Sequence, residues 1–312
     1  MSPDQFFLME STLAETPNII CRKLTKFYGA TRGIENLDLT VGHGEIFGFL
    51  GPNGAGKTTT IRMLMGLIRP TAGSAMVVGQ DAWKQSVEIK RHVGAIQGDV
   101  RLYEHMHVQE LLDYIDGFRS SAGSLRAELV ERLDLAVGKK VRSLSRGNRQ
   151  KVAIVVAMMH DPEILILDEP TLGLDPLMQQ VFYTILGEFK QRGKTVFLSS
   201  HILSEVERVC DRVGIVKEGS LMDVRSIEEL RQNKIRHMDV SFSGEVDVSR
   251  FKALPQVLEV KRLDGYLRIT LRGDIDAIIK EIARNQVVDL TFTQPSLEDF
   301  FMSFYHGTDD DG

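Results

Sequence analysis

The segment IFGFLGPNGAGKTTT, from Ile46 to Thr60, sets the architecture expected for this 312-residue chain. Its first part, Ile46 to Leu50, is a short apolar run of the kind that forms a buried β-strand. A glycine-rich turn follows. Apolar residues then recur with helical spacing until Pro70, at Ile61, Leu64, Met65 and Ile68. The sequence therefore predicts a strand, a loop and a helix, in that order.

The turn itself matches the phosphate-loop pattern G-x-x-x-x-G-K-S/T, and it lies between a strand and a helix as that motif requires. Successive backbone N–H groups of such a loop, together with the helix N-terminus, bind phosphate anions. Lys57 is expected to reach the β and γ phosphates, and Thr58 to offer an oxygen to Mg²⁺. The expected nucleotide contacts are Gly51, Pro52, Asn53, Gly54, Ala55, Gly56, Lys57, Thr58 and Thr59.

Two further apolar runs end in polar residues. Ile164 to Leu167 is followed by Asp168 and Glu169, and Thr195 to Ser199 ends just before His201. Open α/β sheets bind their ligands at such strand ends. Asp168 would hold the metal, directly or through water, and Glu169 is the candidate general base that polarises the attacking water. These residues predict a magnesium-nucleotide site.

Along the chain, short β-type runs alternate with helical patterns, which predicts an α/β fold with a mainly parallel sheet. We expect an N-terminal tail at 1–17, an ATPase domain at 18–235 with a mostly helical subdomain at about 98–161, an accessory domain at 236–305 and an acidic tail at 306–312. The accessory domain reads βαββαβ around an Asp264–Gly265 turn and ends in a helix at 296–305, which predicts an α+β ferredoxin-like module.

Composition narrows the function classes. The formal charge of −5 does not suggest wholesale binding to nucleic acid phosphates. Cys21 and Cys210 are too few and too far apart for a disulfide framework or a metal knuckle. The longest purely apolar stretch, Val152 to Met159, is far shorter than a membrane-spanning helix, and the first 16 residues lack the pattern of a secretory signal. We therefore expect a cytoplasmic protein.

Other residues follow one another around the phosphate loop in an order that resembles the ATP-binding subunit of an ABC transporter, over about Ile19 to Ser220. This resemblance implies a P-loop NTPase (RecA-like) core with an N-terminal β subdomain and an inserted helical subdomain. It also implies roles for single residues. Tyr28 stacks on adenine, Gln97 is the switch glutamine beside the metal, and His201 lies near the γ-phosphate. Ser145, Gly147 and Asn148 form the signature loop, and Leu174 and Asp175 the D-loop, at the nucleotide.

The signature loop departs from the family's Leu-Ser-Gly-Gly-Gln, because Arg146 replaces the first Gly and Asn148 replaces Gln. Gln97 is followed by Gly98, where an acidic residue is common in the family. The variant signature and a C-terminal module that ends in PSLEDFF resemble the branch whose partners are separate ABC-2-type permeases. That branch implies a head-to-tail homodimer at the cytoplasmic face of the membrane. It also implies export of a drug-like compound, lipid or ion, with no nucleic acid partner.

In that branch the surface from the Gln97 loop to Leu112 would take the permease's cytoplasmic helix.

Two other function classes remain open. One is a soluble ABC-type ATPase that acts on ribosomes or DNA, although such proteins usually carry two cassettes or long coiled coils. The other is a small-molecule P-loop kinase, which would not explain Ser145 to Gln150 or His201.

The accessory domain would be a dimer brace or a ligand sensor. We favour the brace, because its strands offer apolar faces and no convergent polar site.

Overall fold

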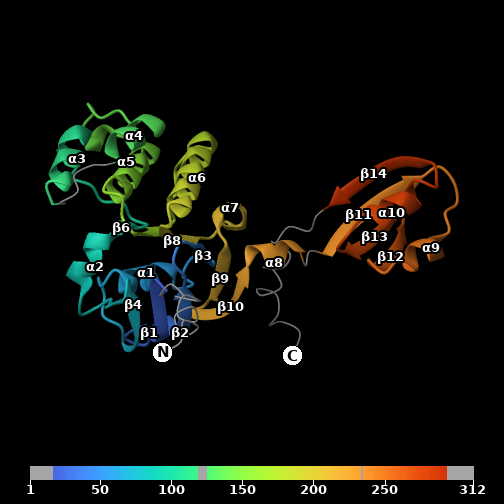
Figure 1. Cartoon of the computed structure of the whole chain (residues 1–312), viewed down its shortest axis with the longest axis horizontal. Coiled ribbons are helices and arrows are strands. Elements are labelled where there is room, and N and C mark those ends of the chain that lie inside the picture. The colour runs from blue at the N-terminus through green and yellow to red at the C-terminus, as the bar shows by residue number, and fades with distance from the viewer. Residues whose placement is uncertain (1–16, 119–124, 233–234, 294–312) are drawn as a thin grey trace, which may run out of the picture. The chain divides into compact units, whose positions relative to one another are not determined.

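The computed structural model describes residues 17–118, 125–232 and 235–293. The chain divides into two compact units, residues 1–224 and 225–312 (Figure 1). The second unit thus begins at Arg225, whereas the sequence placed the start of the accessory domain at residue 236. The predicted N-terminal tail (apart from Pro17), the predicted helix at 296–305 and the acidic tail at 306–312 lie outside the described residues.

A six-stranded sheet forms the centre of the first unit, in the order β10-β9-β3-β8-β7-β6. The strand pairs β9/β3, β3/β8, β8/β7 and β7/β6 are parallel. Strands β3, β7 and β8 are buried along their whole length, as apolar runs in a covered parallel sheet should be. The strands are β3 (Ile46–Leu50), β6 (Val93–Ile96), β7 (Ile164–Asp168), β8 (Thr195–Ser200), β9 (Arg212–Lys217) and β10 (Ser220–Ser226). Because the central strands are parallel, their carboxyl ends meet at one edge of the sheet.

A second, antiparallel sheet in the first unit has the order β2-β1-β4-β5. It packs on the central sheet through a shared apolar core that includes Leu24 and Ile34 from the antiparallel sheet, Phe47 and Phe197 from the central one, and Ile61 from helix α1. The rings of Phe47 and Phe197 stack with centroids 5.9 Å apart. The elements are β1 (Ile19–Tyr28), β2 (Thr31–Val41), α1 (Lys57–Leu64), β4 (Ala72–Val77), β5 (Gln80–Asp81) and α2 (Ser86–His92).

The chain between β6 and β7 is mostly helical, as the sequence predicted (Figure 1). Leu111, Leu112 and Leu129 are buried, and an ion pair of 2.8 Å between Arg126 and Asp116 joins two of the helices. The helices are α3 (Val108–Asp116), α4 (Arg126–Arg132), the short 3₁₀ helix η2 (Val141–Ser143) and α5 (Arg146–Met158). Helices α6 (Pro176–Gln191) and α7 (Leu203–Val209) follow β7 and β8 respectively.

Helix α1 is shorter than the apolar spacing predicted. It ends at Leu64, and Gly66 adopts a positive φ of 61°. The N–H of Leu67 donates to the carbonyl of Arg62, and the N–H of Gly66 to that of Met63. These two bonds form a Schellman cap, which ends the helix before Ile68 and Pro70. No helix among the described residues is both long and apolar enough to span a bilayer.

The second unit contains one four-stranded sheet in the order β12-β13-β11-β14, with every pair antiparallel. With one helix after β11 and one after β13, this is the strand arrangement of a ferredoxin-like βαββαβ module. Its core includes Met238, Val240, Phe251, Ile269 and Ile278. The elements are α8 (Ile227–Gln232), β11 (Ile235–Phe242), α9 (Val248–Lys252), β12 (Val257–Leu263), β13 (Tyr266–Arg272), α10 (Asp276–Ile282) and β14 (Val287–Thr293).

Candidate nucleotide site

The phosphate loop connects β3 to α1, and two of its glycines have no room for a side chain. A Cβ at Gly51 would lie 2.3 Å from the carbonyl oxygen of Val216, and one at Gly56 would lie 2.4 Å from that of Gly33. Gly56 also has φ of 105° at the N-cap of α1. The close approach lets the loop turn tightly into the helix, and loops of this kind present backbone N–H groups and a helix N-terminus to a phosphate.

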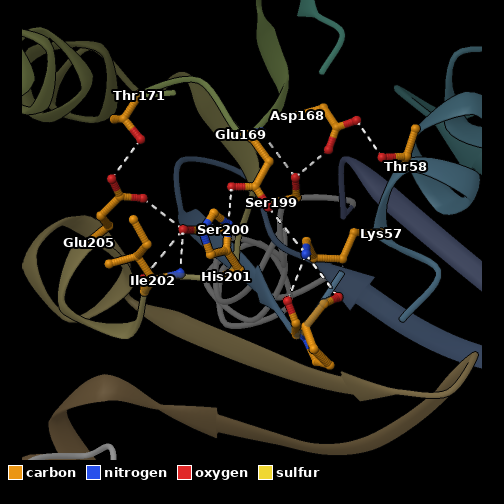
Figure 2. Close-up of polar contacts among 12 residues, drawn as sticks. Lys57, Thr58, Asp168, Glu169, Thr171, Ser199, Ser200, His201, Ile202 and Glu205 are labelled. Atoms are coloured by element: carbon orange, nitrogen blue, oxygen red, sulfur yellow. Dashed lines mark hydrogen bonds and ion pairs between the residues drawn. The ribbon is translucent and has the colours of Figure 1, made fainter. Parts of the chain in front are cut away.

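Lys57 is the first residue of α1 and is buried, with 6% of its surface exposed. Its Nζ donates hydrogen bonds to the carbonyls of Gly51 (2.6 Å) and Pro52 (3.2 Å), and it forms an ion pair with Glu169 Oε1 at 3.2 Å (Figure 2). The ammonium group of Lys57 is therefore folded back over the phosphate loop, beside the carboxylate of Glu169, which directly follows β7.

Asp168 at the end of β7 is buried and holds two hydroxyl groups. Thr58 Oγ1 donates to its Oδ2 at 2.7 Å, and Ser199 Oγ donates to its Oδ1 at 2.6 Å (Figure 2). A carboxylate and a hydroxyl in contact are oxygen donors of the kind that Mg²⁺ prefers, and Mg²⁺ takes its remaining ligands from phosphates and water. The residues present therefore fit this metal.

Glu169 lies between a cation and an imidazole. Its Oε1 faces Lys57, and its Oε2 is 2.7 Å from His201 Nδ1 (Figure 2). Its backbone has φ of 49°, in the left-handed region, and its N–H donates to Ser199 Oγ at 3.1 Å. A non-glycine residue in this region is held there by its surroundings, and such strain is concentrated at functional sites.

Gln97 follows β6 and is exposed. Ile96 pairs with Leu167, so Gln97 comes next to Asp168 across the sheet edge. A Cβ at Gly98 would lie 3.1 Å from Asp168 Oδ2. Gln97 also lines a hollow of about 390 Å³ with Arg62 and other residues between β6 and α5.

Tyr28 ends β1 and is 45% exposed. A Cβ at Gly33 would lie 3.0 Å from Tyr28 Cε2, and the carbonyl of Gly33 is the group that approaches Gly56. The same Cβ would lie 3.0 Å from Thr59 Cγ2, so the ring lies close to the start of α1. Lys26 Nζ is 5.4 Å from the centroid of the ring.

The remaining predicted residues form a second group. Ser145 is the N-cap of α5 and accepts hydrogen bonds from the Asn148 backbone N–H (3.3 Å) and side-chain amide (3.2 Å). A Cβ at Gly147 would lie 2.5 Å from the carbonyl of Gly173, so α5 begins against the loop that follows Glu169. Asp175 caps α6 by accepting from the Met178 N–H at 3.0 Å. The polar contacts of Ser145, Asn148 and Asp175 are thus local, and those of the first group surround the phosphate loop.

Sequence reasoning missed several residues that hold the site together. Ser199 bonds to both Asp168 and Glu169, and Gln150 Nε2 donates to the carbonyl of Pro170 at 2.7 Å. Glu205 accepts from the hydroxyls of Thr171 and Ser200. Ser199 and Ser200 could have been noticed as hydroxyls at the end of a buried strand. The partners of Gln150 and Glu205 have no signal in the sequence, because they depend on how helices pack.

Comparison with known proteins identifies the family of the chain. The sequence model of the family described as "ABC transporter" matches residues 34–172, and one described as "AAA domain, putative AbiEii toxin, Type IV TA system" matches residues 138–207. The bacitracin transport ATP-binding protein BcrA of Bacillus licheniformis is 36% identical over 91% of this chain and 96% of its own length. The probable multidrug ABC transporter ATP-binding protein YbhF of Escherichia coli is 36% identical over 72% of this chain and 39% of its own length.

Solved structures share the fold. A structure described as an ATP-binding subunit of an ABC transporter aligns with a TM-score of 0.64 and 29% identity, over 68% of this chain and 91% of that one. The dimeric cassette MJ0796 aligns with a TM-score of 0.62 and 22% identity, over 67% of this chain and 98% of that one. With a P-loop NTPase fold, a phosphate loop and full-length relatives at this identity, the chain belongs to the ATP-binding ATPase subunits of ABC transporters.

Proposed function

We propose that this subunit binds and hydrolyses ATP to drive export through a separate membrane permease of the ABC-2 type. The observation that carries the proposal is the set of contacts around the phosphate loop, in which Thr58 meets Asp168 and Glu169 lies between Lys57 and His201. Relatives named for bacitracin transport and multidrug transport support export of a drug-like compound, a lipid or an ion. The subunit would work at the cytoplasmic face of the membrane.

At the proposed site, the residues of the loop from Gly51 to Thr59 bind the phosphates, and Tyr28 stacks on the adenine. Lys57 transfers its hydrogen bonds from the loop carbonyls to the β and γ phosphates, which leaves the Glu169 carboxylate free to accept a proton from water. His201 orients that carboxylate and faces the γ-phosphate. Thr58, Asp168 and Gln97 would hold Mg²⁺, which neutralises charge on the phosphates.

The second group of residues completes the site of another copy. Ser145, Gly147 and Asn148 lie at the N-terminus of α5, where N–H groups and the helix dipole favour an anion. In a two-fold dimer this end would face the phosphate loop of the partner subunit, with Asp175 beside it. ATP then closes the dimer, and loss of the γ-phosphate opens it.

Permease docking is proposed at the surface near Gln97, on three aromatic residues. Tyr103, Tyr114 and Phe118 are 57%, 43% and 70% exposed. Their rings pack edge to face, with centroid distances of 5.5 Å between Tyr103 and Tyr114 and 4.9 Å between Tyr114 and Phe118. A cluster of exposed aromatic residues is typical of a binding surface for another protein.

For the C-terminal unit we propose the role of a dimer brace. Strand β14 is an edge of its sheet, and its Val287, Val288 and Leu290 are 38%, 68% and 37% exposed. An apolar edge strand can pair with another chain. Removing this unit should then weaken the closed dimer in ATP, measured by sedimentation. Equal dimerisation of the shortened chain would count against the brace.

The proposed function is tested by reconstituting the full chain in vesicles with the permease that co-purifies with it. We expect ATP-driven transport. Because Gln97 comes next to Asp168 and precedes the proposed docking surface in the chain, Gln97→Ala should still bind ATP and lose most of the transport. Unchanged transport in this variant would contradict the coupling role of Gln97.

A further inference from the structure

Helix α7 carries a buried carboxylate that neither binds phosphate nor holds metal in the proposed site. Glu205 is 8% exposed, and each of its oxygens accepts one short hydrogen bond. Thr171 Oγ1 donates to Oε1 at 2.6 Å, and Ser200 Oγ donates to Oε2 at 2.7 Å (Figure 2). A buried acid is destabilising unless its oxygens are satisfied. The carboxylate of Glu205 therefore holds the hydroxyls of Thr171 and Ser200 in place.

The two donors are chain neighbours of the two residues proposed to act on water and phosphate. Ser200 directly precedes His201, and its Oγ also accepts from the Ile202 N–H at 2.9 Å, so the turn that carries His201 is fixed from both sides. Thr171 lies two residues after Glu169. One carboxylate thus links the backbone segment of His201 to that of Glu169.

The loop after Glu169 has a second attachment, to α5. The buried side chain of Gln150 donates to the carbonyl of Pro170 at 2.7 Å. Within the loop, the Leu172 N–H donates to the carbonyl of Glu169 at 3.2 Å. Gln150 therefore holds the loop from the α5 side and Glu205 holds it from the α7 side, so that the loss of either leaves one attachment.

A residue of α6 also faces this carboxylate. Burial and the negative charge of the nearby Glu205 raise the pKa of Tyr183 well above its ordinary range. The Arg208 guanidinium on α7 lies 5.2 Å from the centre of the Tyr183 ring. Glu205 thereby lies next to three segments: the loop that leads to α6, through Thr171, the end of β8, through Ser200, and α6 itself, through Tyr183.

We propose that Glu205 is a positioning residue for hydrolysis, which holds His201 Nδ1 at hydrogen-bond distance from Glu169 Oε2 by fixing Ser200 and Thr171. The proposal rests on the roles given above to Glu169 and His201. Without the carboxylate, the bonds of Ser199 and Gln150 remain, but the His201 turn and the Glu169 loop lose their shared attachment. The 2.7 Å contact between His201 and Glu169 is then held less tightly. The phosphate loop is also held by bonds outside this link, because Lys57 donates to the carbonyl of Gly51 and Thr58 donates to Asp168.

The test is steady-state ATP hydrolysis and nucleotide affinity of the full-length chain with Glu205→Ala, which removes both acceptors. We expect kcat to fall by on the order of 10- to 100-fold, as for a misplaced reacting group, with the affinity for ATP unchanged. Glu205→Gln should restore most of kcat, since its carbonyl can accept from Ser200 while its amide donates to the hydroxyl of Thr171.

A matched control is available in the other unit. Glu281 is also 8% exposed and forms an ion pair with Arg284 at 2.7 Å, far along the chain in α10. Glu281→Ala should leave kcat unchanged. If Glu205→Ala fails to fold, Ser200→Ala and Thr171→Val carry the test, since each removes one hydroxyl with little change of volume. Each should lower kcat, and their effects should be non-additive because they share one partner.

Failure of the proposal is separable from failure of the site assignment. If Glu169→Gln and His201→Ala abolish hydrolysis while Glu205→Ala and both hydroxyl variants keep the wild-type kcat, the positioning role is wrong and the site stands. A parallel loss of ATP affinity and kcat in folded Glu205→Ala would also overturn it, since that result indicates general damage. If Glu169→Gln hydrolyses ATP normally, the site assignment itself is wrong, and the positioning role falls with it.

Discussion

Glu169 shows how a single residue can be held ready for a reaction. Its backbone is in the left-handed region, its N–H is bound to Ser199, and its two carboxylate oxygens face Lys57 and His201. None of these contacts is made by a neighbour on the same strand. β8 and the phosphate loop together therefore set the position of the carboxylate, which in the proposed site reduces the reorganisation needed for reaction.

Replacing this carboxylate tests its role as a general base. Glu169→Gln should bind ATP and lose turnover by roughly 10²- to 10⁴-fold, about 3 to 5 kcal/mol, as expected for a missing acid/base group. Sedimentation should show the variant trapped as a dimer in ATP. Glu163→Gln, an exposed acid just before β7, is the control and should hydrolyse ATP normally. Normal turnover in Glu169→Gln would remove Glu169 from this role.

In the proposed site Lys57 has a different role, because its ammonium group would supply charge-assisted hydrogen bonds to the phosphates in the ground state as well. Lys57→Ala should weaken ATP binding itself by about 1.5 to 3 kcal/mol, roughly 10- to 100-fold. Titration with a fluorescent ATP analogue measures this. Lys280→Ala, on the exposed face of α10, is the control. An unchanged affinity in Lys57→Ala would contradict its assignment to the phosphates.

Elements that lie far apart in the sequence are joined at the nucleotide site by close backbone approaches. Gly56 meets Gly33, and Gly147 meets Gly173, in each case at a distance that leaves no room for a Cβ. The first contact seats β2 against the phosphate loop. The second contact seats the start of α5 against the loop after Glu169. A shift of α5 is therefore transmitted to the segment that carries Glu169.

The sequence predicted local structure well because local structure depends on local pattern. Strand β3 begins and ends at the predicted residues, because turn-forming residues lie on both sides of it. Helix α1 was predicted too long, because the apolar spacing continued to Ile68 although Gly66 ends the helix. The contacts of Thr58 with Asp168 could be anticipated, since strand ends meet at one edge. Those of Glu205 could not, because they require the relative placement of α6, α7 and β8.

In the second unit, a cross-strand pair joins β11 and β13. Arg268 donates from Nε to Asp239 Oδ1 at 2.8 Å and from Nη2 to Oδ2 at 2.7 Å. These bonds hold the pKa of Asp239 below its ordinary value. A carboxyl group whose pKa is depressed in the folded state stabilises the fold at pH values above its unfolded pKa, about 3.9. This contribution to stability is lost as the pH falls through the pKa of the folded state.

Asp239→Asn should therefore destabilise β11 and β13 slightly at pH 7, since the pair is partly exposed. The difference in stability between the variant and the wild type should narrow as the pH falls below about 3.9. Hydrogen exchange of peptides from these two strands measures it, with both proteins compared at the same pH. A difference that grows on acidification would show that the pair does not stabilise the sheet.

For the whole molecule, the arrangement of charged and aromatic groups separates chemistry from coupling. The residues proposed to act on ATP lie at the carboxyl ends of β3, β7 and β8, whereas the exposed aromatic cluster lies beyond β6, in and around α3. Gln97 directly follows β6 and precedes the aromatic cluster in the chain. Such a division predicts that docking can be damaged without damage to hydrolysis, which distinguishes a transporter subunit from a soluble ATPase or kinase.

Replacing Tyr103 and Phe118 together by Ser tests this division. An aromatic hot spot typically contributes about 2 kcal/mol or more to a protein interface, so permease binding should weaken by at least roughly 30-fold. ATP hydrolysis by the isolated subunit should stay normal, while transport in vesicles falls. Trp83→Ser is the matched control, because Trp83 is 42% exposed and lies between β5 and α2. If the double variant still co-purifies with the permease and supports transport as the control does, the aromatic cluster is not the docking surface.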